Sequence, residues 1–326
     1  MKPLWWIGLV ALLAVPLLDL LLPASWQIAG AMPKVFVFAI AALGVTVATG
    51  WGGLLHLGSA AFLAIGAYTY AVLTAPVFPF AIGFWPGLGA ALVAGAVTGV
   101  LLGLPTARLR GDYLAIVTLG LGEIIQDVMR NLEPITKGAQ GLSSLPGPAV
   151  PFAPPDAGWP GFYLYLGLLL AVVALLSRMR RSRLGRAMVA VREDEIAARC
   201  CAVDAGRTAV VAMAVAGALG ALAGGLWAAL YHSSNDPSTY DFSMSIMILG
   251  IAIIGGLGSP IGALVGALLL GGFSLVVLDR LATAMGGSVS DNVLMQPNNW
   301  KFLVYGLALI LVMRLRPGGL CEEPKG

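Results

Sequence analysis

The stretch RMRRSRLGRAMVAVREDEIAARCCAVDAGR, residues 178–207, decides how the rest of the chain is arranged. This charged island holds eight of the nineteen Lys and Arg residues and four acidic residues, and long apolar runs flank it on both sides. In a chain that is 59% hydrophobic, so dense a charged segment must lie in water against one face of a membrane. Because short loops rich in Arg resist translocation, that face is expected to be the cytoplasmic one.

The charged island is expected to be ordered. Beyond Gly185 it is predicted to form one continuous helix over residues 186–201, because neither Pro nor Gly interrupts it. Glu195 and Arg199 stand in the favourable i,i+4 order for an ion pair, and Asp204 is placed to cap the helix that follows. A long apolar chain with one ordered, charged helix in the cytoplasm is expected to present that helix to a partner protein.

The composition is that of a polytopic membrane protein. Only 11% of the 326 residues are charged and the mean hydropathy is +0.90, whereas globular domains carry about 25% charged residues. We expect an all-α fold with about ten transmembrane helices in one membrane domain over residues 1–326, since each crossing needs about 20 apolar residues. Cys200 and Cys201 are expected to be free thiols, and no metal site is expected without a Cys–His cluster.

The predicted spans all agree with one topology. If the charged island is inside, Arg108, Arg110, Arg314 and Arg316 fall on the same side, as do both termini. The loop 133–160 and the stretch 282–299 then lie outside, and the first span is expected to remain as an uncleaved helix because it is too long for a signal-peptide core. The predicted spans are 4–22, 33–50, 59–75, 80–104, 113–132, 161–176, 208–231, 242–254, 262–278 and 300–313.

Two glycine-interrupted segments stand in corresponding places, one in each half of the chain. Residues 50–58 read GWGGLLHLG, and residues 255–258 read GGLG before Ser259 and Pro260. Unwound backbone at membrane depth is tolerated only where it is buried in protein or lines a cavity, so paired broken segments indicate a transport pathway. The alternative is tight helix packing through Gly, which is common in membranes. Helix packing alone does not require glycine clusters at corresponding places in the two halves of the chain. The transport-pathway interpretation is therefore favoured.

The predicted span 113–132 carries charges at membrane depth. Glu123 lies near its middle, and Asp127 shares a helix face with it at i+4. Because a carboxylate at this depth is costly, Glu123 is expected to face the bundle interior, as a gating or cavity-lining group or as a structural one. For Asp127, a structural ion pair with Arg130 is the preferred interpretation.

His56 invites a catalytic interpretation that the rest of the sequence does not support. A lone His among Gly residues is more often a hydrogen-bonded structural group than a proton carrier. The sequence has no Ser–His–Asp order and no nucleophile elbow, so a membrane-embedded enzyme is a remote alternative. It also lacks the GxxxxGK[ST] phosphate-binding motif, so any nucleotide hydrolysis must occur in another chain.

Five motifs follow one another along residues 42–320. They are DYLAIVTL (112–119) with Glu123-Ile124, TKGAQGL (136–142), the segment 185–198, GGLG (255–258), and the ending from YG (305–306) to RPGGL (316–320). In this order they resemble the motifs of the branched-chain amino acid ABC transporter permeases of the LivM type. In that family the segment that corresponds to 185–198 couples the permease to its ATPase.

The resemblance implies an importer permease of the bacterial inner membrane that binds no cofactor of its own and is not an enzyme. Such a subunit pairs with a second, related permease as a heterodimer and with two cytoplasmic ATPase subunits that bind ATP, and it receives substrate from a periplasmic substrate-binding protein. The residues expected along the substrate pathway are Trp51, His56, Ser59, Thr118, Glu123, Gly255, Gly256 and Gly258. Those expected to contact the ATPase are Gly185, Arg186, Arg192, Glu193, Asp194, Glu195 and Ile196, with Met188 and Val191 adding apolar contacts.

The chain departs from the family pattern near the expected pathway. His56 and Ser59 have exchanged places, Lys137 stands where Gly is usual, and Gln140 stands where Asn is usual. These differences bear on the substrate, for which urea, short amides and other amino acids are the alternatives to branched-chain amino acids. An ion-coupled secondary transporter that uses Glu123 is the alternative from another class, but a self-sufficient carrier has no need of an ordered cytoplasmic helix.

Overall fold

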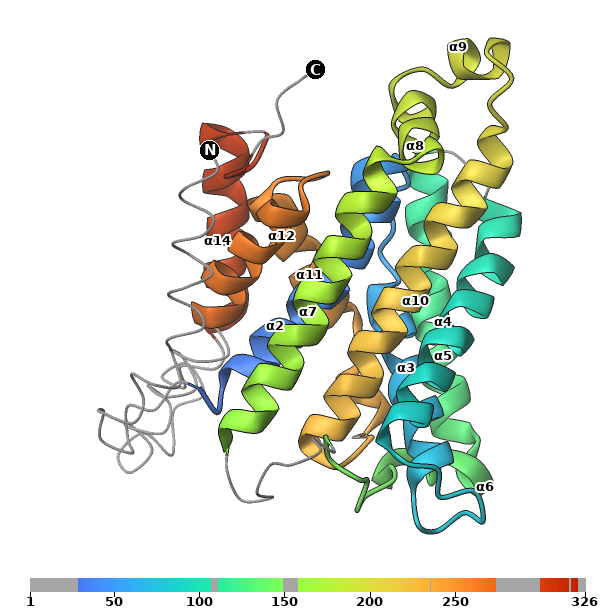
Figure 1. Ribbon diagram of the computed structural model, residues 1–326, viewed down its shortest axis with the longest axis vertical. Coiled ribbons are helices and arrows are strands. Elements are labelled where there is room, and N and C mark those ends of the chain that lie inside the picture. Colours follow the sequence, from blue (N-terminus) through green and yellow to red (C-terminus); the bar gives the residue numbers. More distant parts are fainter. Residues whose placement is uncertain are drawn as a thin grey trace.

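The computed structural model describes residues 29–106, 111–148, 158–234, 236–273, 300–316 and 318–321. In these residues the chain is helical, with one isolated bridge between Ser143 and Ser233, so the predicted all-α class is confirmed. The long helices run roughly side by side in one bundle (Figure 1). The longer helices are α2 (Met32–Val45), α3 (Ser59–Thr74), α4 (Phe84–Thr106), α5 (Asp112–Asn131), α7 (Gly158–Arg181), α8 (Arg183–Glu193), α10 (Ala205–Tyr231), α11 (Phe242–Gly255) and α14 (Trp300–Leu315), and the short ones are α6 (Glu133–Thr136), α9 (Glu195–Cys200) and α12 (Pro260–Gly266).

Five of the described helical segments are long and apolar enough to cross a membrane. They are Met32–Trp51, Phe84–Thr106, Gly161–Arg181, Ala205–Tyr231 and Pro237–Gly255. Three shorter apolar helices, Ser59–Thr74, Pro260–Gly271 and Gly306–Leu315, accompany them. The predicted first span, 4–22, lies outside the described residues, and the predicted number of spans is not confirmed.

Helix α10 lies at the centre of the bundle and packs against α2, α3 and α4. At its crossing with α3 the two backbones touch, because a Cβ atom added at Gly66 would lie 1.9 Å from the Ala221 carbonyl oxygen. In the same way, a Cβ atom at Gly224 would lie 1.9 Å from the carbonyl oxygen of Leu63. Small residues allow this close approach in membranes, where packing drives helix association. These glycines therefore serve helix packing.

The charged island lies at one end of the bundle, where it forms α8 and α9 (Figure 1). The residues that follow α14 reach the same end, because Gly319 packs against Gly256, close to the island. Arg314, in the last turn of α14, therefore shares this island end with the basic residues of the charged island, as the topology predicts. Arg108 and Arg110 lie outside the described residues.

The prediction of one continuous helix over 186–201 is wrong. The helix breaks at Asp194, whose backbone is extended (φ −154°, ψ 107°), so α8 and α9 are separate helices. The Asp194 carboxylate accepts hydrogen bonds from the amides of Ile196 (2.9 Å) and Ala197 (3.0 Å). A short acidic side chain competes well for free amides, and this capping ends one helix and starts the next.

Two local predictions for the charged island are confirmed. Arg199 and Glu195 form the expected i,i+4 ion pair, with 2.6 Å between their nitrogen and oxygen atoms. The carboxylate of Asp204 accepts a hydrogen bond from the amide of Arg207 at 3.1 Å and so caps α10.

Of the predicted external loop, 133–160, residues 133–148 are described and are docked against the bundle at the end opposite the island (Figure 1), and residues 158–160 begin α7. The amide of Leu142 donates to the Ser234 hydroxyl at 2.8 Å, and the Tyr70 hydroxyl donates to the Pro146 carbonyl at 2.6 Å. Lys137 has a left-handed backbone with φ of 59°. Glycine adopts this conformation at little cost, which explains why Gly is usual there in the resembling family.

The α3–α10 crossing generates a stability prediction. Replacing Gly66 with Ala should lower the free energy of unfolding by about 1–3 kcal/mol or more, because the new methyl group would overlap the α10 backbone. Gly89→Ala is the matched control, since a Cβ atom there meets nothing within 4 Å. Thermal unfolding in detergent measures the stability of both purified variants. Equal unfolding midpoints for the two would contradict the close backbone contact between α3 and α10.

Candidate functional site

The two glycine-interrupted segments meet at the island end of the bundle. A Cβ atom added at Gly50 would lie 2.5 Å from the backbone nitrogen of Gly258, so the two backbones are in direct contact. The indole Nε1 of Trp51, a buried residue, donates a hydrogen bond to the Gly258 carbonyl at 2.8 Å. Two segments that are some two hundred residues apart in the sequence thus form one layer. The sequence pattern indicated that they correspond in position, but not that they touch.

Backbone geometry explains why each segment is interrupted. The chain leaves α2 through a π-helical turn, Thr46–Trp51, and is then non-helical until α3 begins at Ser59. Gly53, Gly256 and Gly258 have φ angles of +66°, +119° and +103°, which residues with a side chain rarely adopt. Carbonyl groups exposed by such breaks must find donors outside the helix.

Two arginines of the charged island supply donors to this layer. Arg180, near the end of α7, donates to the Gly258 carbonyl, and its guanidinium lies 5.8 Å from the centre of the Trp51 ring. Arg192, near the end of α8, donates through Nη1 to the Gly50 carbonyl at 2.5 Å. The sequence indicated Arg192 only as an ATPase contact and did not single out Arg180. Nothing in the pattern of charges shows which distant carbonyl an arginine will reach.

Gly255 and Gly256 are covered by neighbouring backbone in this conformation. A Cβ atom at Gly255 would lie 2.0 Å from the Gly262 carbonyl oxygen, and one at Gly319 would lie 2.4 Å from the Gly256 Cα. The amide of Cys321 donates to the Gly255 carbonyl at 3.0 Å. For these two predicted pathway residues, close packing accounts for the glycine.

Three other predicted pathway residues, His56, Ser59 and Thr118, form a separate group. We call this group the second polar cluster, to distinguish it from the polar contacts between the segments at Gly50 and Gly258. All three are buried. The amide of Leu57 donates to the Thr118 hydroxyl at 3.1 Å, and a Cβ atom at Gly58 would lie 2.5 Å from the Thr118 carbonyl oxygen. The loop between α2 and α3 is therefore held against α5.

The second polar cluster contains groups without partners. Within the described residues, neither ring nitrogen of His56 nor the hydroxyl of Ser59 makes a hydrogen bond. The His56 ring packs against Phe62, with 5.2 Å between ring centres. Burial without a polar partner favours the uncharged imidazole, so the cluster is polar but neutral. The structure therefore contradicts the prediction that His56 is a hydrogen-bonded structural residue.

Glu123 does not face the bundle interior as expected. It is exposed on the outer surface of this subunit, on the same side of α5 as Asp127. The predicted ion pair between Asp127 and Arg130 does not form in the part of the chain that the structure describes. On the inner side of α5, Leu114 and Thr118 are buried, and Gln126 donates to the Pro237 carbonyl at 3.1 Å. An amphipathic helix of this kind carries its charged face away from its own subunit.

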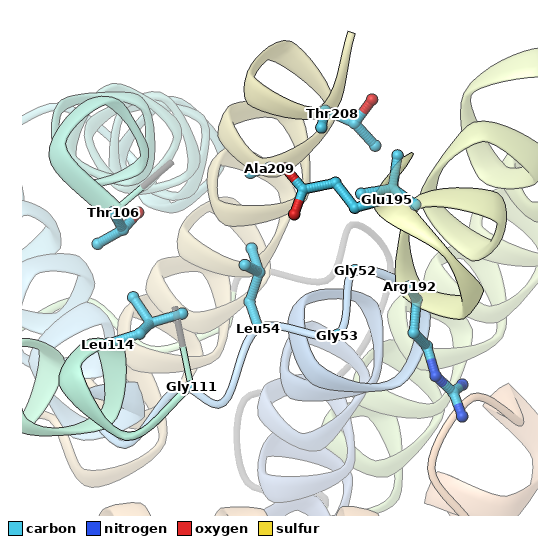
Figure 2. Close-up of a pocket in the computed structure, with 12 residues that line it drawn as sticks. Gly52, Gly53, Leu54, Thr106, Gly111, Leu114, Arg192, Glu195, Thr208 and Ala209 are labelled. Carbon is cyan, nitrogen blue, oxygen red and sulfur yellow. The ribbon is translucent and has the colours of Figure 1, made fainter. Parts of the chain in front are cut away.

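A cavity of about 210 Å³ is lined by residues of the charged island and of the membrane helices. Figure 2 shows Leu54 near its centre and Glu195 reaching across it towards Ala209, while the Arg192 guanidinium points away. The cavity is lined by Gly52, Gly53, Leu54, Thr106, Gly111, Leu114, Val191, Arg192, Glu195, Ala205, Thr208 and Ala209.

The predicted ATPase-contact residues divide into two groups. Gly185, in the first turn of α8, packs against the backbone of Arg180, Arg186 donates to the Arg181 carbonyl at 2.6 Å, and Met188 is fully buried, so Met188 is not available to a partner. In contrast, Glu193 and Asp194 are exposed and Ile196 is 77% exposed, in spite of its apolar side chain.

Membrane-length apolar helices with two interrupted segments in contact define a multi-pass membrane protein of the transporter class. The family model for the permease component of branched-chain amino acid transport systems matches residues 27–313. The chain therefore belongs to the branched-chain amino acid transport permease family, and the resemblance stated from the sequence is confirmed.

Relatives agree with this assignment. The chain is 36% identical over 307 residues to the high-affinity branched-chain amino acid transport system permease protein LivM of Escherichia coli strain K12, covering 87% of this chain and 67% of that protein. It is 25% identical to the probable LivM of Methanocaldococcus jannaschii, covering 72% and 66% of the two chains. It is also 28% identical over 162 residues to Escherichia coli LivH, covering 50% and 47%. No solved structure matches significantly.

The contact between Leu57 and Thr118 can be tested by a pair of substitutions. Thr118→Val removes the acceptor of the Leu57 amide and should lower the free energy of unfolding by about 1–3 kcal/mol. Thr118→Ser keeps the hydroxyl and should be much closer to the parent protein. Thermal unfolding in detergent compares them, and a Val variant that is as stable as the Ser variant would show that this hydrogen bond does not hold the loop.

Proposed function

We propose that the chain is one of two permease subunits of an ATP-driven importer for branched-chain amino acids. In this proposal it lies in the bacterial inner membrane with its island end in the cytoplasm. Separate ATPase subunits dock on α8 and α9 of the charged island, and a periplasmic binding protein delivers the substrate at the opposite end. The observation that carries the proposal is the charged outer face of α5.

The carboxylates on that face disfavour direct contact with lipid. A carboxylate near the centre of a bilayer costs about 3 kcal/mol even on permissive scales, and Glu123 lies near the middle of α5 with Asp127 one turn beyond it. Water or another protein must therefore cover this surface. A second, related permease that brings its own polar helix to the same place would enclose a water-filled pathway between the two subunits. The similarity to both LivM and LivH supports a pair of related subunits.

The island end supports the assignment of separate ATPases. Ile196 is 77% exposed on α9, beyond the membrane helices, and the exposed carboxylates of Glu193 and Asp194 lie beside it. An apolar side chain ringed by charged ones is typical of a protein contact, because the apolar group anchors the interface and the charges set its register. A purely basic segment would suit anionic lipid headgroups, but the acidic residues would not.

Branched-chain amino acids are the proposed substrate because the relatives named LivM share 36% identity with most of this chain. The second polar cluster is neutral and buried. Such surroundings suit an apolar side chain better than a charged one. Urea, short amides and other amino acids remain the alternatives, and the binding protein that works with this permease would select among them.

The pathway can be tested with single cysteines in a background without Cys200, Cys201 and Cys321. A cysteine at Gly120, on the charged face of α5 and with open space for a side chain, should react with a charged, water-soluble maleimide in the assembled complex. Saturating substrate-loaded binding protein should change that rate. The matched control is Val97→Cys on α4, which is also exposed, by 53%, but on an uncharged helix that should face lipid and stay unreactive.

If the cysteine at Gly120 reacts no faster than the one at Val97, the charged face of α5 does not line a water-filled pathway. The carboxylate itself is tested by Glu123→Gln, which should fold normally but lower the uptake rate about tenfold if the charge keeps the pathway hydrated. Uptake at the parent rate would exclude an essential role for that charge.

The docking site has its own prediction. Ile196→Ser should reduce co-purification of the ATPase subunits by about tenfold or more, because an exposed apolar anchor contributes on the order of 2 kcal/mol when buried in an interface. Ile196→Val keeps an apolar side chain and should retain most of the binding. Normal co-purification and import by the Ser variant would rule out α9 as the docking helix.

A further inference from the structure

The layer formed by Gly50 and Gly258 is joined directly to the charged island. Arg192 donates to the Gly50 carbonyl from the last turn of α8, and its Cγ would lie 3.1 Å from a Cβ atom added at Gly53. The same guanidinium lies 3.9 Å from the position of a Cβ atom at Gly258. One side chain of the island therefore touches both glycine-interrupted segments.

Arg180 completes this connection from α7. It donates to the Gly258 carbonyl that also accepts from Trp51, and it lies over the Trp51 ring. Arg180 and Arg192 are close enough for their positive charges to repel each other. Two like charges stay together here because backbone carbonyls at the ends of interrupted helices and an aromatic face attract each of them. The arrangement depends on Gly50 and Gly258 remaining in contact.

Arg192 lies at the end of its helix and beside a cavity. Arg192 itself is exposed at the island end, and Asp194 breaks the helix two residues later. The cavity of about 210 Å³ lies between this part of the island and Leu54 of the first glycine-interrupted segment. A displacement of α8 and α9 into or away from this space would change the distance between Arg192 and Gly50 without breaking the core of the bundle.

We infer that Arg180 and Arg192 are positioning residues that couple the ATPase-facing helices α8 and α9 to the contact between the segments at Gly50 and Gly258. When the ATPases hold α8 in the arrangement described here, the two arginines clamp these segments together. When α8 moves, Arg192 leaves the Gly50 carbonyl and the two segments separate. This inference rests on the proposed function, since it requires ATPases that bind the charged island.

Arg192→Gln in the complete complex, reconstituted in proteoliposomes, tests the coupling. Because a hydrogen bond from a charged group is strong, its loss should shift the balance between joined and separated segments by about tenfold or more. We expect ATP hydrolysis to continue while the number of substrate molecules imported per ATP falls about tenfold. Arg192→Lys keeps a cationic donor and should restore part of the import, which a merely structural defect would not predict.

Arg207→Gln is the matched control. Arg207 is exposed at the same end of the bundle and pairs with Asp204 at the start of α10, away from both glycine-interrupted segments. Its replacement removes the same charge and should leave the ratio of import to hydrolysis unchanged. If Arg192→Gln and Arg207→Gln give the same ratio as the parent complex, the clamp is wrong and the proposed function still stands.

A labelling measurement keeps the inference testable if the Gln variant does not fold. A cysteine at Leu257, next to Gly258 and with Leu257 39% exposed, should react with a thiol reagent at different rates in the nucleotide-free and the ADP–vanadate-trapped complex. That difference should shrink in Arg192→Lys. An undiminished difference in the Lys variant would overturn the clamp, whereas failure of the parent chain to bind any ATPase would overturn the proposed function itself.

Discussion

The structure depends on a requirement of backbone chemistry, namely that carbonyl groups freed by an interrupted helix find donors even where little water is present. Gly50 and Gly258 have such carbonyls, and their donors are the Trp51 indole and the guanidinium groups of Arg180 and Arg192. The absence of side chains at the two glycines lets the backbones touch, so one set of donors serves both segments. The charged island is therefore bound directly to both glycine-interrupted segments.

The position of Glu123 distinguishes the competing kinds of transporter. A carrier that worked alone with Glu123 as its coupling group would enclose that carboxylate within its own bundle. Here Glu123 is exposed on the outer face of α5. In the proposed function, this subunit contributes one wall of a shared pathway, which accounts for this placement, and the exposed Ile196 at the island end is the proposed binding site for the ATPases.

Sequence reasoning located the helices well because apolar length and glycine breaks are local signals. The i,i+4 pair of Glu195 and Arg199 and the cap at Asp204 were predicted correctly for the same reason. The errors concern which groups bind the free backbone amides and which way a side chain faces. The Asp194 carboxylate accepts hydrogen bonds from backbone amides and so interrupts the expected continuous helix, and Glu123 lies on the exposed face of α5 and not towards the bundle interior. Contacts of Arg180 and Arg192 with distant carbonyls leave no trace in a single sequence.

Uptake by reconstituted proteoliposomes tests most directly whether separate ATPases drive transport through this chain. The vesicles would contain this permease, its related partner and the ATPase subunits, with the binding protein and radiolabelled leucine outside and ATP inside. Leucine should accumulate only with hydrolysable ATP and all subunits, and collapsing the ion gradients should not slow it. Accumulation by this chain alone, driven by an ion gradient and independent of ATP, would contradict the proposed function.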